Sequence, residues 1–86
     1  MSTNEMVKMK RIGEVIRENR EQKKLTVYRL AKLACIPYQT VQGIENGHIV
    51  NPRFDTTVAI ARALNVPIET FFVERRIAYE KSQNAI

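Results

Sequence analysis

The stretch Leu25–Gly47 constrains the fold of this chain most strongly. It reads LTVYRLAKLACIPYQTVQGIENG, two short segments with helical spacing separated by a break at Cys35–Pro37. Thr26 fits an N-cap, because its hydroxyl can accept from an orphan backbone N–H. Pro37 suits the first turn of a new helix, and Gly47 suits the left-handed residue that ends it. The stretch therefore predicts two helices, about Val27–Ala34 and Pro37–Asn46, joined by a turn of three or four residues.

The apolar positions of this stretch predict how the two helices pack. Four are spaced to lock one helix onto the other, namely Leu30, Ile36, Val41 and Ile44, and the small Ala31 fits where the helices cross. Their burial leaves four residues on the outer face of the second helix: Tyr38, Gln39, Gln42 and Gly43. A glutamine amide can form two hydrogen bonds with adenine. The pattern favours a recognition helix, although a plain solvated face is the alternative for the same residues.

Helical spacing also flanks the stretch on both sides. A first helix is expected at about Lys10–Lys23, with one stripe formed by Ile12, Val15, Ile16 and Asn19. A fourth is expected from Phe54 or Asp55 to Leu64, with Asn65 as its C-cap, and Pro67 starts a short fifth. Beyond Val73 the chain either extends the last helix to about Lys81 or remains a tail. The fold class is therefore all-α.

The net charge of +5 is confined to one half of the chain. Residues 1–43 hold nine Lys and Arg against four Glu, whereas residues 44–86 hold five of each sign. A basic surface of this kind is typical of proteins that face phosphate. The lone Cys35 leaves no intramolecular disulfide, and one His with one Cys makes no metal site. No paired carboxylates, nucleophile–base pair or Gly-rich phosphate loop is visible, so no catalytic residue, metal or cofactor is expected.

The chain resembles the phage-repressor/Cro-like helix-turn-helix family of XRE-type regulators. The likeness extends from Ile12 to Phe72 and is most specific in the segment Ile44–Gly47, the pair Asn51-Pro52 and the segment Ile60–Leu64. It implies a compact five-helix lambda-repressor-like domain at residues 10–73. A flexible tail is expected at residues 1–9, and a sixth helix or a tail at residues 74–86.

The same resemblance implies roles for individual residues. Base-reading positions fall on Tyr38, Gln39, Gln42 and Gly43, and DNA-backbone contacts fall on Thr26, Val27, Asn46, His48 and Arg53. Arg20 and Glu45 match an ion pair between the first and third helices. The resemblance implies a transcriptional repressor. We expect it to bind a palindromic double-stranded operator as a dimer, sequence-specifically and through the major groove. We expect no enzymatic activity and no membrane partner, and a cytoplasmic location.

Three residues depart from the family pattern. Cys35 stands where the family prefers Gly, so a side chain would have to adopt positive φ at a cost of roughly 1 kcal/mol. Val27 replaces a polar residue at the start of the second helix. Gly43 supplies no side chain at a base-reading position, so the domain would either make fewer direct contacts or let the backbone approach DNA closely.

Apolar residues at the C-terminal end predict a partner. Ile68, Phe72, Val73 and Ile77 are too many for so small a core to cover, and we expect them at a homodimer interface. The alternative is an antitoxin-like or adaptor protein, whose segment Val73–Ile86 binds another protein and for which DNA binding is secondary.

Overall fold

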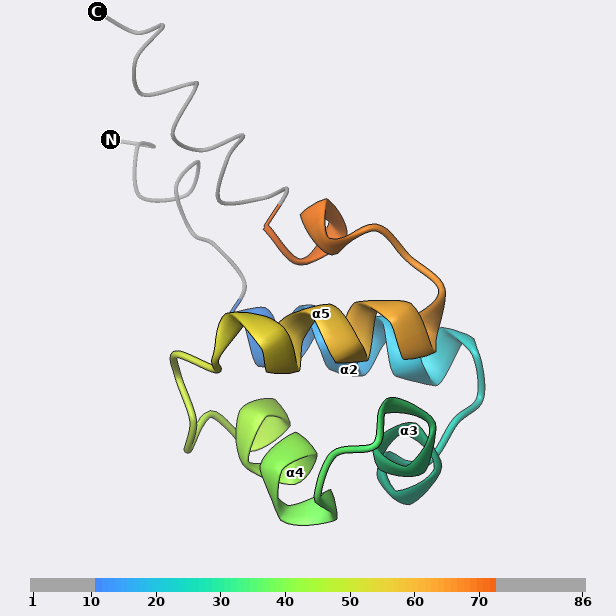
Figure 1. Ribbon diagram of the computed structural model, residues 1–86, viewed down its shortest axis with the longest axis horizontal. Helices are drawn as coiled ribbons and strands as arrows, with labels where there is room; N and C mark the ends of the chain where they lie inside the picture. Colours follow the sequence, from blue (N-terminus) through green and yellow to red (C-terminus); the bar gives the residue numbers. More distant parts are fainter. Residues whose placement is uncertain (1–10, 73–86) are drawn as a thin grey trace, which may run out of the picture.

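The computed structural model describes residues 11–72, in which the regular secondary structure consists of helices joined by turns and loops (Figure 1). The expected all-α class is therefore confirmed. Within this range the structure has four α-helices and one 3-10 turn, in the order α2 (Ile12–Gln22), α3 (Val27–Ala34), α4 (Tyr38–Asn46), α5 (Phe54–Leu64) and η1 (Ile68–Phe71). The predicted bounds of the second helix coincide with those of α3.

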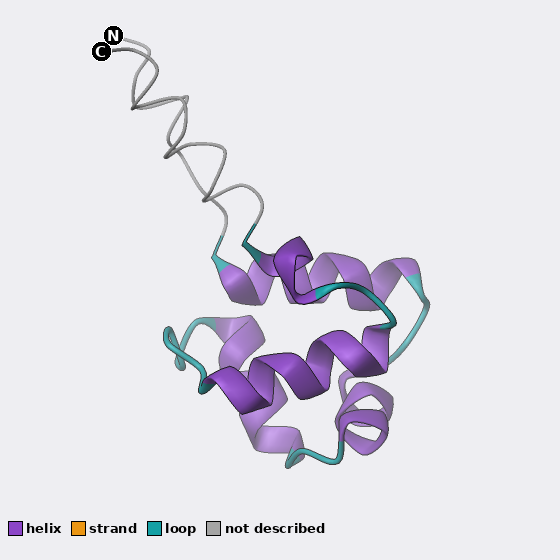
Figure 2. Cartoon of the chain, turned by 45° about the horizontal axis from the view of Figure 1, so that its top comes forward, coloured by secondary structure: helices purple, strands orange, loops and turns teal. Residues whose placement is uncertain are grey.

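The helices surround one core. In both views α2 and α5 run side by side, with α3 and α4 on one side of them and η1 on the other (Figures 1 and 2). Helix α3 packs against α4 and α5, while α2 packs against α4. The largest fully buried side chains come from all four α-helices: Ile16, Leu30, Val41, Ile44, Ile60 and Leu64. The predicted apolar stripes are therefore the surfaces that meet.

Several helices begin or end at the capping residues that the sequence predicts. The backbone N–H of Arg29 donates to Thr26 Oγ1 at 3.0 Å, which caps α3. Gly47 closes α4 with φ +85°, and Asn65 closes α5 with φ +59°. Cys35 ends α3 with φ +58°, as the resemblance led us to expect of a side chain at this position. The turn between α3 and α4 therefore includes one residue held in a conformation that glycine adopts more readily.

The expected fifth helix is not an α-helix. Residues Ile68–Phe71 form a single 3-10 turn after Pro67, closed by hydrogen bonds from Thr70 N to Pro67 O and from Phe72 N to Glu69 O, both 3.0 Å. Bonds between residues three apart place side chains at i and i+3 on one side. Ile68 and Phe71 thereby face the same way, while η1 packs against α2 and α5. The predicted count of five α-helices is wrong for the described residues, and the proposed sixth lies outside them.

Candidate nucleic-acid interface

Helix α4 is held against the core along one face. Val41, Ile44 and Glu45 are buried, whereas Tyr38, Gln39, Gln42 and Asn46 are exposed. Because the buried positions recur at helical spacing, these four side chains lie on the opposite side of α4, which faces solvent. The structure thus presents the three predicted base-reading side chains together on one exposed surface.

An ion pair fixes the orientation of α4 relative to α2. Arg20 Nε donates to Glu45 Oε2 at 2.7 Å and Arg20 Nη2 donates to Glu45 Oε1 at 2.9 Å. The side chain of Glu45 is 2% exposed and that of Arg20 is 12% exposed. The hydrogen bond with Glu45 raises the pKa of Arg20 above its ordinary value, despite burial. The pair is therefore charged, bidentate and nearly dry, which is the geometry in which Arg binds carboxylate best.

Three further hydrogen bonds extend this network, one from Arg20 and two from Arg17. Arg20 Nη1 donates to the carbonyl oxygen of Leu25 at 2.7 Å, which ties α2 to the segment before α3. Arg17 Nε donates to Glu45 Oε1 at 3.4 Å, but its side chain is 45% exposed. Arg20 is therefore central to the network and Arg17 is peripheral. The resemblance named Arg20 and Glu45; Arg17 was missed, although it lies one turn before Arg20 on the same helix.

A hydrogen bond joins two of the exposed side chains of α4. Gln42 Nε2 donates to Tyr38 Oη at 3.1 Å, one helical turn apart. Gln39 makes no side-chain hydrogen bond to any other described residue. The two glutamines therefore differ in how far the protein itself restrains their amides.

Gly43 differs from the other predicted base-reading positions. It is half-buried, and an added Cβ would lie 3.0 Å from Ile49 Cδ1. The backbone N–H of Ile49 also donates to Gly43 O at 3.0 Å. The loop after α4 thus folds back over Gly43. Any contact from this residue to a ligand comes from its backbone.

The predicted DNA-backbone contacts lie at the ends of helices and in the loop after α4. Thr26, Asn46, His48 and Arg53 are exposed, and Val27 is half-buried. Arg53 Nη2 donates to Asp55 Oδ2 at 3.2 Å, but both side chains are largely exposed. An exposed ion pair of this kind is weak and is easily exchanged for another anion.

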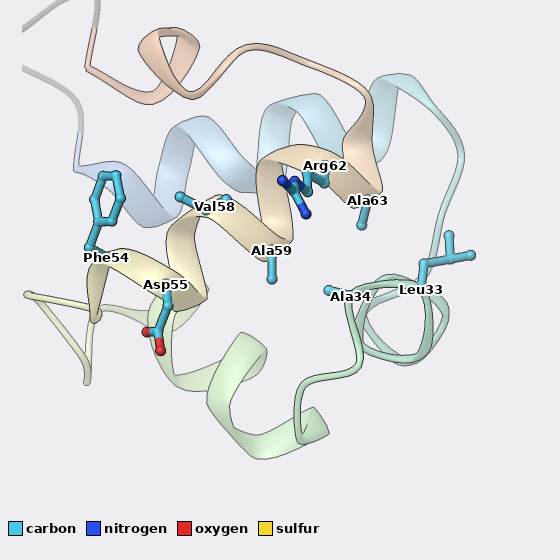
Figure 3. A pocket seen from close by; sticks show the side chains of 8 residues that line it. All are labelled: Leu33, Ala34, Phe54, Asp55, Val58, Ala59, Arg62 and Ala63. Carbon is cyan, nitrogen blue, oxygen red and sulfur yellow. The ribbon is translucent and has the colours of Figure 1, made fainter.

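Small side chains set the packing of α3 on α5. Figure 3 shows Ala34 of α3 and Ala59 and Ala63 of α5 on the two sides of a groove between these helices. Leu33 and Phe54 lie at its edges and are 49% and 73% exposed. Helix α3 therefore packs against α5 as well as against α4.

Sequence reasoning missed one glycine that the helix crossing requires. An added Cβ at Gly13 would overlap the carbonyl oxygen of Ile44 and lie within 3.0 Å of Glu45 Cα. The atoms in the way are backbone atoms, which cannot rotate aside. The sequence did carry a signal, because Gly13 lies inside a predicted helix. Glycine destabilises a helix, so a glycine at such a position usually has a packing reason.

The predicted dimer residues are only partly described. Ile68 and Phe72 are half-buried, whereas Val73 and Ile77 lie outside the described residues, as does the alternative partner-binding segment Val73–Ile86. Phe72 shares a shallow depression with Val50 and Phe54 among other residues. Val50 is 61% exposed and Phe54 is 73% exposed. This apolar surface was not foreseen, because the loop residue Val50 belongs to no periodic pattern.

The described range, residues 11–72, has no group of three or more His, Cys, Asp or Glu side chains that could hold a metal ion. It has no helix of the length and apolarity needed to cross a bilayer.

The comparisons with known proteins agree with this geometry. Residues 16–71 match the helix-turn-helix family, and the chain belongs to that family. Among solved structures it is similar to the restriction-modification controller protein C.AhdI from Aeromonas hydrophila, with 28% identity and a TM-score of 0.69. The match covers 79% of this chain and 97% of that one. A comparison with curated protein sequences finds no relative. Family and structural similarity indicate a DNA-binding transcription regulator.

Proposed function

We propose that this chain is a sequence-specific regulator, without enzymatic activity, that inserts α4 into the major groove of double-stranded DNA. The observation that carries the proposal is the construction of α4. One face is fixed by buried packing and by the Arg20–Glu45 pair, while the other presents Tyr38, Gln39 and Gln42 to solvent. A rigid helix with outward amides can bind base edges without the loss of conformational entropy that ordering its backbone would require.

The proposed base-reading residues are Tyr38, Gln39 and Gln42, with Gly43 contributing only backbone. Each glutamine amide offers one oxygen acceptor and two N–H donors, the set that adenine N6 and N7 require. Gln39 is exposed and has room to rotate toward a base edge. Gly43 is half-buried beneath Ile49, so its backbone is less accessible than the exposed side chains of the two glutamines.

The proposed DNA-backbone contacts surround this surface. The first turn of α3 carries backbone N–H groups that have no partner inside the helix, and such groups bind phosphate. We assign Val27 this role through its N–H, and Thr26 through its hydroxyl hydrogen, since its oxygen already accepts from Arg29 N. All three remaining residues are exposed: Asn46 is the last residue of α4, and His48 and Arg53 lie in the segment that follows it. Their polar groups would contact phosphates along the next stretch of strand.

Two copies of the chain are proposed to bind a palindromic operator as a repressor. One recognition helix reads only a few base pairs, and a two-fold pair about 34 Å apart reads successive major grooves. The apolar side chains of Phe72, Phe54 and Val50 would form the surface that the second copy covers.

Sedimentation of the chain alone and with DNA tests whether it forms this dimer. Phe54→Glu is the first variant to use, because Phe54 is largely exposed and its replacement leaves the core intact. If the chain stays monomeric at micromolar concentration and binds its site one-to-one, the proposed dimer is refuted.

The experiment for the function as a whole is selection followed by titration. The full chain selects duplexes from a random pool, and the selected duplex is compared with random duplex at several salt concentrations. Both affinities should fall steeply with salt, by a log–log slope of about 0.9 for each neutralised phosphate. The selected duplex should bind more tightly at every salt concentration. Equal affinity for both duplexes would refute sequence-specific reading, and a reporter placed downstream of the selected site tests repression.

A further inference from the structure

The hydrogen bond between Tyr38 and Gln42 lies inside the proposed reading surface. Tyr38 is 39% exposed and Gln42 is exposed, yet Gln42 Nε2 donates to Tyr38 Oη at 3.1 Å. The two residues are one turn apart, so their side chains lie in one row along α4. The bond restrains the outermost torsion of the glutamine, which would otherwise be nearly unrestrained on a helix surface.

The geometry is compatible with simultaneous contact to a base. A bidentate contact with adenine uses Gln Oε1 as acceptor and one Nε2 hydrogen as donor. The second Nε2 hydrogen is then still available, because the amide carries two. Tyr38 Oη accepts that second hydrogen in the structure. In the structure this bond holds the amide with Nε2 toward Tyr38 and leaves Oε1 for another partner.

We propose that Tyr38 is a positioning residue that sets the base preference of Gln42. This inference rests on the proposed function and refines it: the Tyr38 hydroxyl takes part in base reading through Gln42, and not by a base contact of its own. An amide held by Tyr38 presents an acceptor and a donor in fixed order, which suits adenine. An amide that rotates can instead present its oxygen to the amino group of cytosine or its N–H groups to guanine. Loss of the tyrosine hydroxyl should thus broaden the preference at that base pair while leaving the others intact.

The first test needs no DNA. In Tyr38→Phe the ring is kept and only the hydroxyl is lost. Nitrogen-edited NMR of the full chain should show the two side-chain amide protons of Gln42 shifting and exchanging faster by rotation in the variant, with the Gln39 amide unchanged as internal reference. Tyr28→Phe, on α3 and with its ring beneath Lys32 Nζ at 5.6 Å, is the matched control and should leave Gln42 unaffected. If the Gln42 amide signals were the same in Tyr38→Phe as in the wild-type chain, the hydrogen bond between Tyr38 and Gln42 would be refuted. This result would not depend on what the protein binds.

The second test measures base preference. Duplexes are selected from a random pool by the wild-type chain, by Tyr38→Phe, by Gln42→Ala and by the double variant. In Tyr38→Phe the preference at one base pair of each half-site should fall by roughly fivefold, the contribution of one net hydrogen bond. The same change made in the Gln42→Ala background should have no effect at that base pair, because there is no amide left to position.

The outcomes separate this inference from the proposed function. Absence of any sequence preference in the wild-type chain would refute both. A wild-type preference that Tyr38→Phe leaves unchanged would refute the positioning role alone. Equal weakening on selected and random duplex would show that the hydroxyl binds DNA backbone, and additive effects in the double variant would show an independent base contact; either result also refutes positioning.

Discussion

The inner and outer faces of α4 are built from different kinds of contact. On the inner face Val41 and Ile44 are almost completely buried, and both oxygens of Glu45 accept bonds from Arg20. On the outer face the two glutamines are exposed, and one of them has no side-chain bond to the rest of the described chain. A substitution on the inner face should therefore change the free energy of unfolding, and one on the outer face should change DNA affinity with little effect on folding.

The most damaging single change on the inner side is expected at Gly13. In Gly13→Ala the new methyl group meets the backbone of Ile44, so α2 and α4 must separate. Overpacking against atoms that cannot move costs about 3 kcal/mol or more, a large part of the total stability of a small domain. Thermal and urea denaturation followed by circular dichroism would measure the loss.

Gly43→Ala is the matched control for that change. There the new methyl group meets the end of the Ile49 side chain, which can turn away. Replacing glycine by alanine inside a helix also gains up to about 1 kcal/mol of propensity. The unfolding free energy should consequently change by less than about 1 kcal/mol. Comparable losses in the two variants would contradict the close approach of α2 and α4.

The next largest effect is expected at the buried ion pair. Glu45→Gln removes the buried negative charge and leaves the nearly buried guanidinium of Arg20 with only the exposed Glu21, 4.0 Å away, as a counter-charge. Breaking a fully buried pair from one side costs about 3–5 kcal/mol, and we expect about 2–4 kcal/mol here because Arg20 is 12% exposed. Arg17→Ala is the control, since Arg17 is 45% exposed and lies 3.4 Å from the same carboxylate, and it should cost no more than about 0.5 kcal/mol. Denaturation midpoints give both values, and equal losses would mean that the network is shared rather than centred on Arg20.

The difference between the faces also explains what the sequence could predict. The caps at Thr26, Gly47 and Asn65 depend on neighbours within a few residues, and the structure has them as expected. The left-handed Cys35 followed from the resemblance, because a turn of this length requires positive φ at that position. Exposed residues on α4 followed from helical spacing.

Contacts between distant parts of the chain could not be predicted in the same way. The need for Gly13 arises from the carbonyl oxygen of Ile44, which is remote in sequence. Spacing placed Gly43 on the outer face, but only the path of the loop shows that Ile49 covers it. The 3-10 form of η1 depends on how Ile68 and Phe71 meet α2 and α5. A helical pattern of four residues fits either type of turn.

On the outer face the comparison predicts a loss of affinity without a loss of stability. Gln39→Ala should lower the affinity for the selected duplex by roughly 1–3 kcal/mol and that for random duplex much less. Arg53→Ala should weaken binding to both, since the expected partner of this exposed arginine is phosphate. Fluorescence anisotropy on the two duplexes separates these patterns. If Gln39→Ala weakened both equally, Gln39 would be a backbone contact.

The smallest effect is expected at Thr26, where the two kinds of contact meet in one side chain. Its hydroxyl oxygen accepts from Arg29 N and supports the start of α3, while the hydroxyl hydrogen is proposed to reach a phosphate. Thr26→Ala should cost about 1 kcal/mol of stability as a lost N-cap. It should also weaken binding to selected and random duplex alike, because phosphate contacts carry no sequence information. Thr26→Ser keeps the hydroxyl and should restore both properties. If Thr26→Ser restored stability but not affinity, the role of Thr26 would be to cap α3 and not to bind phosphate.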